Sequence, residues 1–531
     1  MAQLEKNLQQ SIPASPDDPL KFVSHTGLTP RNNLELTTVD EMTTIISSMK
    51  NVGAGIDNIS GKIFKAVYEK IIHKLTYFVN LCLETGQFPS NLKIAIVKPI
   101  FKTGDKRYMS NYRPISILPY ISKILEKIIY DRIINHLNFN NILCPNQFGF
   151  RKGLSTYMPL LLVQEKVTKA FENNKIVCGI YLDLKKAFDT VDHNILISKL
   201  SAYGMLGTFF NIIISYLSNR TQCVAYLNSI SGLCSLNIGV PQGSILGPLL
   251  FPLYINDFPN ICKKSSCILY ADDTAIFFEA DNASALQTSL NMELPRICKW
   301  FKTNKLSLNT TKTFCQLYNN SSKNITINVN LDGVDIKFVE KVKYLGMYID
   351  ANMKWKSHID HISKVISRNI GIIKKSTFFL DEKHLILLYN SLCLPYLNYC
   401  SLVWGHSSDT LLHKLEILQK KVIRIIDGQG RFSHTSPIFA KLKLLKVRDI
   451  TKQQIITVMH NVLLGRAPTI ISSMFTLLQD NSRASRQNSH FQEPYTRKLY
   501  RSRTVFWLGP RLWNKMISPS FPQNDEVPVS K

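Results

Sequence analysis

Two adjacent aspartates stand in the stretch Tyr270-Ala-Asp-Asp273, with an apolar run on either side. This pattern predicts a strand, a tight turn and a second strand, with both carboxylates at the turn. Adjacent ionised carboxylates repel each other and lose hydration when they are half-buried, and a divalent cation relieves both costs. An exposed Asp-Asp turn is the ordinary alternative. The pair therefore indicates a metal site only together with other residues.

A third aspartate, Asp183, directly follows the compact apolar run 176–182, which predicts a buried strand. The chain between the two sites is long enough to place all three carboxylates in one sheet. Three carboxylates could share two metal ions, and such a pair of ions makes or breaks phosphodiester bonds. Asp189 and Asp192 lie nearby, but they flank the start of a helix and are interpreted as helix caps.

The elements that must position these aspartates alternate between strands and helices. Residues 91–98 alternate like a strand, and isoleucines between 121 and 133 recur at helical spacing. A helix is expected from His193, with Asp192 as its N-cap and Gly204 as its stop. From about residue 351 the pattern becomes helical, with lysines and arginines away from the apolar stripe. These basic residues indicate either a nucleic-acid surface or a solvated face.

The charge balance indicates a polyanionic partner. The 531 residues include 64 Lys and Arg against 38 Asp and Glu, a formal net charge of +26, and 45% are hydrophobic. Nucleic acid is the first candidate, because the basic residues are not gathered into one membrane-binding cluster. No segment reads as a signal peptide or as the ~20 apolar residues of a membrane span, so an intracellular protein without membrane association is expected.

Motifs in a fixed order carry a family resemblance. The stretches Gly179-Ile-Tyr-Leu-Asp183, Gly239-Val-Pro-Gln242-Gly243 and Tyr270-Ala-Asp272-Asp273 resemble motifs A, B and C of reverse transcriptases. Segments around Lys102, Arg113 and 146–156 resemble the fingers of non-LTR retrotransposon enzymes, and those at 300–313 and 344–346 resemble motifs D and E. The resemblance covers about residues 41–350. The stretch 506–514 is also similar to jockey- or CR1-like elements.

The resemblance implies an α+β fold. This is a right-hand polymerase with fingers and an antiparallel-sheet palm, followed by an all-helical thumb and C-terminal region. The expected domains are a linker or tail (1–40), the fingers and palm (41–350), a helical thumb-like domain (351–470) and a basic C-terminal segment (471–531).

The implied activity is that of an RNA-directed DNA polymerase, which transfers nucleotides to a primer 3′-hydroxyl by two-metal chemistry. Asp183, Asp272 and Asp273 would be its catalytic residues and would hold two Mg²⁺ ions, with Mn²⁺ as an alternative. The implied partners are an RNA template, a DNA primer or target, and dNTPs. The implied location is the nucleus or a cytoplasmic ribonucleoprotein, and the oligomeric state is not indicated.

The resemblance also assigns binding residues. Contacts to the dNTP are implied for Lys102, Arg113, Phe188, Gln242 and Lys312. The two fingers cations would neutralise the triphosphate, a flat Phe188 ring would exclude a 2′-hydroxyl, and Lys312 would protonate the leaving pyrophosphate. Contacts to the template-primer are implied for Gln147, Arg151, Gly243, Tyr344 and Gly346. Gln242 and Gly243 are further expected to start a helix after Pro241. Surface charges, a core aromatic and a plain helix-start turn are the structural alternatives for these residues.

Some features depart from the family pattern. Elements of this type usually carry an endonuclease domain ahead of the polymerase, and we expect this chain to lack it. Pro252 is expected to interrupt the helix after motif B, because an interior proline costs on the order of 3 kcal/mol. Gly55-Ile-Asp57 stands where Gly-Pro-Asp is more usual. These departures leave open a catalytically inactive, nucleic-acid-binding remnant of a truncated element.

A third hypothesis is a mobile-intron maturase or an RNA-dependent RNA polymerase on the same palm. Phe188 and the segment 111–116 argue against it.

Overall fold

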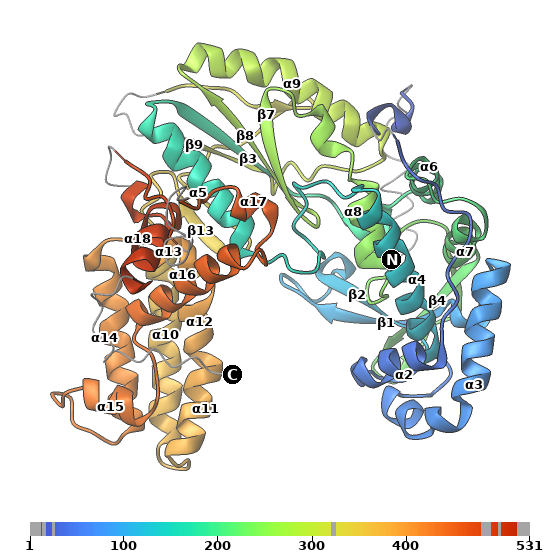
Figure 1. The fold of residues 1–531 in the computed structure, drawn as a ribbon, viewed down its shortest axis with the longest axis horizontal. Coiled ribbons are helices and arrows are strands. Elements are labelled where there is room, and N and C mark those ends of the chain that lie inside the picture. The colour runs from blue at the N-terminus through green and yellow to red at the C-terminus, as the bar shows by residue number, and fades with distance from the viewer. Residues whose placement is uncertain are drawn as a thin grey trace.

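The computed structural model describes residues 12, 17–23, 27–319, 325–478, 490–496 and 501–517. Helices and β-sheets are combined in it (Figure 1), which confirms the expected α+β class. The helices of the C-terminal half gather on one side of a four-stranded sheet, and the N-terminal helices with a second sheet lie on the other. In this part of the chain, no helix is both long enough and apolar enough to cross a membrane.

The four-stranded sheet carries the three aspartates. Its antiparallel strands have the order β7-β8-β3-β9, with the bounds β7 (Ser265–Tyr270), β8 (Asp273–Ala280), β3 (Ile176–Leu182) and β9 (Phe314–Tyr318). All of β3 is buried because it lies between two cores: Ile180 faces one core and Tyr181 the other. The predicted strand and the predicted strand-turn-strand around the Asp pair are confirmed.

The second sheet has the order β2-β1-β4-β5, with β6 also paired to β4. Its strands are β1 (Ile94–Phe101), β2 (Tyr112–Ile117), β4 (Arg220–Tyr226), β5 (Ser229–Ile230) and β6 (Cys234–Leu236). β1 and β2 are antiparallel, whereas β1 and β4 are parallel and far apart in sequence. Two small hairpins complete the strands: β10 (Asn330–Leu331) with β11 (Val334–Asp335), and β12 (Lys341–Tyr344) with β13 (Met347–Asp350).

The helices predicted over 121–133 and from His193 are present, as α4 (Tyr120–Phe139) and α6 (His193–Ala202). The same half also contains α2 (Val39–Ser48), α3 (Gly61–Thr85), α5 (Tyr157–Glu172), α7 (Gly207–Leu217) and α9 (Ala283–Thr303). Asp192 caps α6 as predicted, since its carboxylate accepts a hydrogen bond from the Ile195 N–H at 3.1 Å. Gly204, at a φ of +80°, stands just beyond the end of α6. The start predicted for this helix is confirmed, and its predicted stop at Gly204 lies two residues beyond the observed end at Ala202.

The helix after Pro241 differs from the prediction in two respects. It is α8 (Gly247–Tyr254), so it begins later than Gln242 and Gly243, which lie in the preceding turn. Pro252 does not interrupt α8. The missing N–H of Pro252 would have bonded to Pro248, in the first turn of a helix of only eight residues, so the helix loses a single bond.

The C-terminal half is helical, as predicted. Its helices are α10 (Lys356–Ser376), α11 (Glu382–Leu392), α12 (Leu394–Asn398), α13 (Ser401–Trp404), α14 (Asp409–Ile426), α15 (Ser436–Lys441), α16 (Val447–Leu463), α17 (Thr469–Ser472) and α18 (Val505–Ile517). The isoleucine stripe of α10 is buried against this helical group. His358 lies in the same interior, beside Trp404.

The two cores do not follow the expected domain boundaries. The second core joins the helices after residue 351 to α5 and to one face of the four-stranded sheet. The first core takes in Leu34, with Phe22 and Val23 packed on its edge. The described part of the segment expected as a linker or tail (1–40) therefore packs against this core. The expected boundaries themselves stay predictions.

Candidate active site

The sheet edge brings the three aspartates together. Leu182 of β3 pairs with Thr274 of β8, so the next position in this register places Asp183 beside Asp273. Residues paired in this way lie on the same face of a sheet. Asp272 occupies the two-residue turn between β7 and β8, where Ala271 has a φ of +56°. The turn thus brings two carboxylates to the end of the strand that carries the third.

The three carboxylates influence one another electrostatically. Burial raises the pKa of Asp272, and the charge of Asp183 raises it further. Burial also raises the pKa of Asp273 to about 6, with the charges of Asp272 and Asp183 adding to the effect. Solvent reaches Asp273, yet the surrounding protein removes part of its hydration. The concentrated negative charge is therefore unfavourable unless a proton or a cation neutralises it.

Two cations of the second sheet lie within electrostatic reach of these carboxylates. Arg113 lies in β2 opposite Ile100, and Lys102 follows β1, with its N–H donating to the Asn111 carbonyl at 2.9 Å. Both side chains are exposed. Their charges oppose the rise in the pKa of Asp272. Neighbouring cations and carboxylates suit a metal-bound polyphosphate, because the cations can bind its phosphates and the carboxylates can bind its metal ion.

Asn309 holds Asp183 and was missed from sequence as a site residue. Its side-chain N–H donates to Asp183 Oδ2 at 2.7 Å, and its backbone N–H donates to the Asp183 carbonyl at 2.8 Å. The Thr313 hydroxyl accepts the Asp183 N–H at 3.3 Å. In the sequence, Asn309 reads only as a loop asparagine, because its partner lies 126 residues away.

Gln147 holds the turn that carries Asp272. The side chain is 1% exposed, and its Oε1 accepts from the N–H groups of Ala271 at 2.9 Å and Gly149 at 2.7 Å. Around it, residues 146–148 pair with Leu269 of β7. Arg151 is half-buried and donates to the carbonyls of Cys144 and Gln147. The predicted template-primer contact of the buried Gln147 side chain is corrected to a positioning contact, and that of Arg151 stays a prediction.

Phe188 lies within an aromatic group. Its ring centre is 4.7 Å from that of Phe251 and 6.0 Å from that of Phe150, which stands on the segment after Gln147. Phe188 is half-buried, so part of the ring remains open. These contacts on two sides fix the orientation of the Phe188 ring. A ring that excludes a 2′-hydroxyl would need such a fixed orientation. Its predicted contact with the dNTP stays a prediction.

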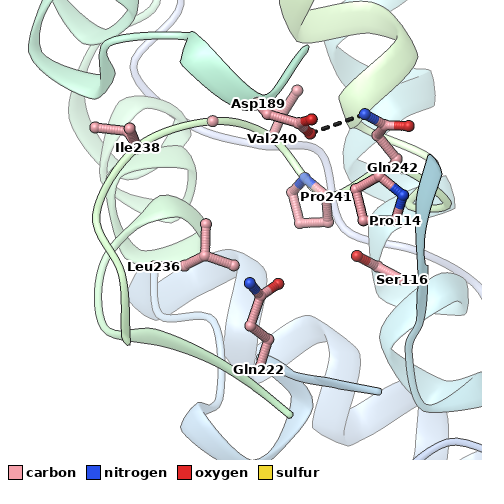
Figure 2. Close-up of a pocket in the computed structure, with 10 residues that line it drawn as sticks. Pro114, Ser116, Asp189, Gln222, Leu236, Ile238, Val240, Pro241 and Gln242 are labelled. Carbon is pink, nitrogen blue, oxygen red and sulfur yellow. Dashed lines mark hydrogen bonds between the residues drawn. The ribbon is translucent and has the colours of Figure 1, made fainter. Parts of the chain in front are cut away.

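Gln242 and Gly243 lie in a loop between the Asp189 turn and β2. The Gln242 amide donates to Asp189 Oδ1 at 2.8 Å, at the rim of a pocket that also takes in Pro114 and Ser116 (Figure 2). Asp189 therefore holds Gln242, and its interpretation as a helix cap is corrected. Gly243 has a φ of +126°, and a Cβ there would lie 2.4 Å from the Ser116 carbonyl. This close approach requires glycine.

Three predicted site residues remain: Tyr344 is buried, Gly346 lies in a turn, and Lys312 is exposed in a loop. Tyr344 is buried, with its ring 5.2 Å from that of Tyr181, which leaves its side chain no surface for the template-primer. Its predicted contact is corrected to a packing role. Gly346 forms the β12–β13 turn at a φ of +77°, where Tyr399 donates to the Leu345 carbonyl at 2.6 Å. Lys312 is exposed in the loop after Asn309. The roles of Gly346 and Lys312 stay predictions.

The carboxylates fit a hard cation in chemistry and charge. In the described ranges, no three His, Cys, Asp or Glu side chains converge closely enough to hold a metal by themselves. Mg²⁺ is usually held by one or two carboxylates, with substrate phosphates and waters as its other ligands. Asp183, Asp272 and Asp273 thus offer part of a ligand set, and a bound nucleotide would have to complete it.

Comparison with known proteins identifies the sheet region. Residues 100–349 match the family model described as reverse transcriptase (RNA-dependent DNA polymerase). Their sequence is similar to that of a reverse transcriptase domain. The match contains the three aspartates, the cations Lys102 and Arg113, Phe188 and Asn309. It confirms the family resemblance inferred from the motif order.

Curated relatives extend this similarity along most of the chain. The chain is 28% identical over 461 residues to the Drosophila melanogaster protein described as a probable RNA-directed DNA polymerase from transposon X-element, covering 84% of this chain and 48% of the relative. It is also 28% identical to the polymerase from the D. melanogaster mobile element jockey, covering 78% of this chain and 46% of the relative. The chain spans about half the length of these relatives.

Proposed function

We propose that the chain is an RNA-directed DNA polymerase of a non-LTR retrotransposon. The observation that carries the proposal is the meeting of Asp183, Asp272 and Asp273 at one sheet edge, within electrostatic reach of Lys102 and Arg113. In this proposal the four-stranded sheet is the palm, and the sheet built on β1 and β2 belongs to the fingers. The helices from α10 to α16 are the thumb. The family match and the named relatives support the assignment.

The chain's own residues would bind and orient the reactants. The exposed cations Lys102 and Arg113 would receive the triphosphate of the incoming nucleotide. The Asp183 carboxylate, fixed by Asn309, would stand opposite the turn that presents Asp272 and Asp273. Mg²⁺ bound at these carboxylates, or Mn²⁺ in its place, would supply charge neutralisation at the reacting phosphate and activation of the primer hydroxyl. Lys312, on the exposed loop, would give a proton to the departing pyrophosphate.

Phe188 would select the sugar. Its ring packs against those of Phe150 and Phe251 and is half-buried. A rigid ring beneath the nucleotide sugar would leave no space for a 2′-hydroxyl, so deoxynucleotides would be preferred. The loop of Gln242 and Gly243 borders the same space and would contact the nucleotide or the template-primer.

Primer extension tests the proposal. Purified protein is given an RNA template with an annealed DNA primer, MgCl₂ and dNTPs, and the expected result is template-directed extension. Asp272→Asn is expected to lose at least about a hundredfold in rate, because it removes charge that acts in the transition state. Asp281→Asn, an exposed aspartate beyond the other end of β8, is the matched control and should keep the parental rate.

Two results would contradict the proposal. Binding of the template-primer without extension, with parent and Asp272→Asn indistinguishable, would instead identify an inactive nucleic-acid-binding remnant. Preferential use of NTPs by the parent would indicate an RNA polymerase on the same palm. Phe188→Ala provides a further check, since it should raise the use of NTPs relative to dNTPs and retain extension.

A further inference from the structure

Three phenylalanine rings are exposed at one end of the helical region. Phe378 and Phe379 directly follow α10 and are 84% and 87% exposed. Phe432, in the loop between α14 and α15, is 91% exposed. Large aromatic side chains are usually among the more buried residues, so neighbouring exposed rings mark a contact surface.

The three rings lie at the same end of the helices. Lys441, the last residue of α15, forms ion pairs with Glu382 at 2.6 Å and with Asp427 at 2.5 Å. Glu382 begins α11, three residues after Phe379, and Asp427 ends α14, five residues before Phe432. The two loops that carry the rings are therefore joined through one lysine, at the end of the molecule where α11 and α15 are drawn (Figure 1).

This aromatic tip also has a surplus of positive charge. Lys374 and Lys375 end α10, and Arg431 stands over the Phe432 ring at 5.9 Å. None of these three forms an ion pair with another described residue, whereas Glu382 and Asp427 share the single cation Lys441. Asp381 is held by the His384 ring at 2.6 Å. The cations of the tip are thus free to meet an external anion.

A basic stripe connects the tip with the four-stranded sheet. Lys364, Arg368 and Lys375 recur every four to seven residues on the exposed side of α10. This stripe follows His361, which lies near Lys343 of β12, and the fourteen steps from His361 to Lys375 cover about 21 Å at 1.5 Å per residue. A polyanion that follows this stripe away from the sheet would arrive at the three rings.

We propose that the aromatic tip, defined by Phe378, Phe379, Phe432, Lys374, Lys375 and Arg431, binds single-stranded nucleic acid. Exposed rings beside unpaired cations match a strand whose bases stack while its phosphates contact the charges. In a duplex the base faces are stacked on one another, so only the phosphates could contact the tip, through its cations. An apolar protein partner would leave these cations uncompensated. The surface lies at the far end of α10 from the aspartates, so it adds a binding site to the polymerase and does not depend on catalysis.

Binding of short oligonucleotides tests the tip. Fluorescence anisotropy with a labelled 20-nucleotide single strand, as RNA and as DNA, compares the parent with the Phe378→Ala/Phe379→Ala double variant. About tenfold weaker binding is expected, with an unchanged salt dependence, because stacking is lost and the phosphate contacts remain. Lys374→Ala/Lys375→Ala should instead reduce the slope of log K against log salt. Phe139→Ala, a ring 66% exposed at the end of α4, is the matched control and should bind like the parent.

Two further measurements locate and identify the contact. A single strand with 5-iodouracil should cross-link to the tryptic peptide 376–383, which contains both adjacent rings. A blunt duplex should bind the double variant as tightly as the parent. Equal single-strand binding by parent and double variant, or an equal loss for the duplex, would overturn the proposal. So would a loss confined to vesicles of phosphatidylserine and phosphatidylcholine, which would identify a membrane surface.

Discussion

At the residue scale, the chemistry of the site depends on partners that neutralise or orient three carboxylates. Asp183 is oriented by Asn309, and the pKa of Asp273 is raised by burial and by its acidic neighbours. The cations that oppose this effect at Asp272 come from a different sheet. The charge and orientation of these carboxylates therefore depend largely on residues distant in sequence.

Asn309→Ala tests whether this orientation matters. The substitution removes the amide that holds Asp183 Oδ2, and residues that orient metal-binding carboxylates are worth about ten- to a hundredfold in activity. We expect dNTP incorporation to fall by that factor, with half-maximal activity moved to higher Mg²⁺ and a melting temperature close to that of the parent. Asn228→Ala, an exposed loop asparagine, is the control. Unchanged Mg²⁺ dependence would refute the positioning role.

Asp273→Asn tests the raised pKa. A folded-state pKa of about 6, against an ordinary value of 3.8, favours the protonated carboxyl. The resulting stability is present below about pH 4 and is lost as the pH rises through about 6. In EDTA, the neutral variant should therefore melt at a higher temperature than the parent at pH 8, and the difference should shrink toward pH 4. Thermal melts across this range provide the measurement. A difference independent of pH would contradict the raised pKa.

At the scale of elements, the turn between β7 and β8 depends on a third segment. Residues 146–149 pair along β7, and Gly149 approaches so closely that a Cβ would lie 2.2 Å from the Ala271 nitrogen. Gln147 bonds to the N–H of Ala271, the residue whose positive φ turns the chain toward Asp272. The orientation of Asp272 and Asp273 therefore depends on the neighbouring segment 146–149 as well as on the hairpin, because that segment contacts the turn.

Gln147→Leu distinguishes a role of Gln147 in holding the turn from a role in contacting the template-primer. The substitution leaves two N–H groups without their acceptor, and an unsatisfied buried donor costs about 1–3 kcal/mol. We expect a lower melting temperature and a lower kcat, with little change in KM for the template-primer. A raised KM with unchanged thermal stability would instead restore the contact predicted from sequence.

At the scale of the whole molecule, the C-terminal segment is bound to the domain that carries the site. Arg501 forms an ion pair with Glu165 of α5 at 2.8 Å and another with Glu172, and α18 packs against α16. The second core continues from the four-stranded sheet through α5 into these helices. The helical region is therefore joined to the sheet by packing as well as by the chain at residue 351.

Arg501→Ala tests this attachment. Two largely buried glutamates lose their shared partner, and hydrogen bonds to charged groups are worth about 1.5–3 kcal/mol. Chemical denaturation should show destabilisation of that order. Arg107→Ala, which removes an exposed pair with Asp105, should change stability by less than about 1 kcal/mol. Equal effects of the two substitutions would show that Arg501 does not hold the C-terminal segment.

The sequence by itself determined the local elements and the identity of the reacting groups. The buried strand before Asp183, the Asp272–Asp273 turn and the capped helix α6 follow from apolar spacing and from turn and cap residues, which act over a few positions. The motif order determined the family. These features are local in the chain, so the one-dimensional pattern contains them.

Only the tertiary structure decided which residues position the carboxylates and the loops around them. Asn309, Gln147 and Asp189 acquired positioning roles because folding places them against partners 53 to 126 residues away. Tyr344 lost its predicted template-primer contact because packing buried its side chain. The aromatic tip likewise required two loops to meet through Lys441. Hydrogen bonds and burial between distant segments depend on the path of the folded chain, and no local pattern encodes that path.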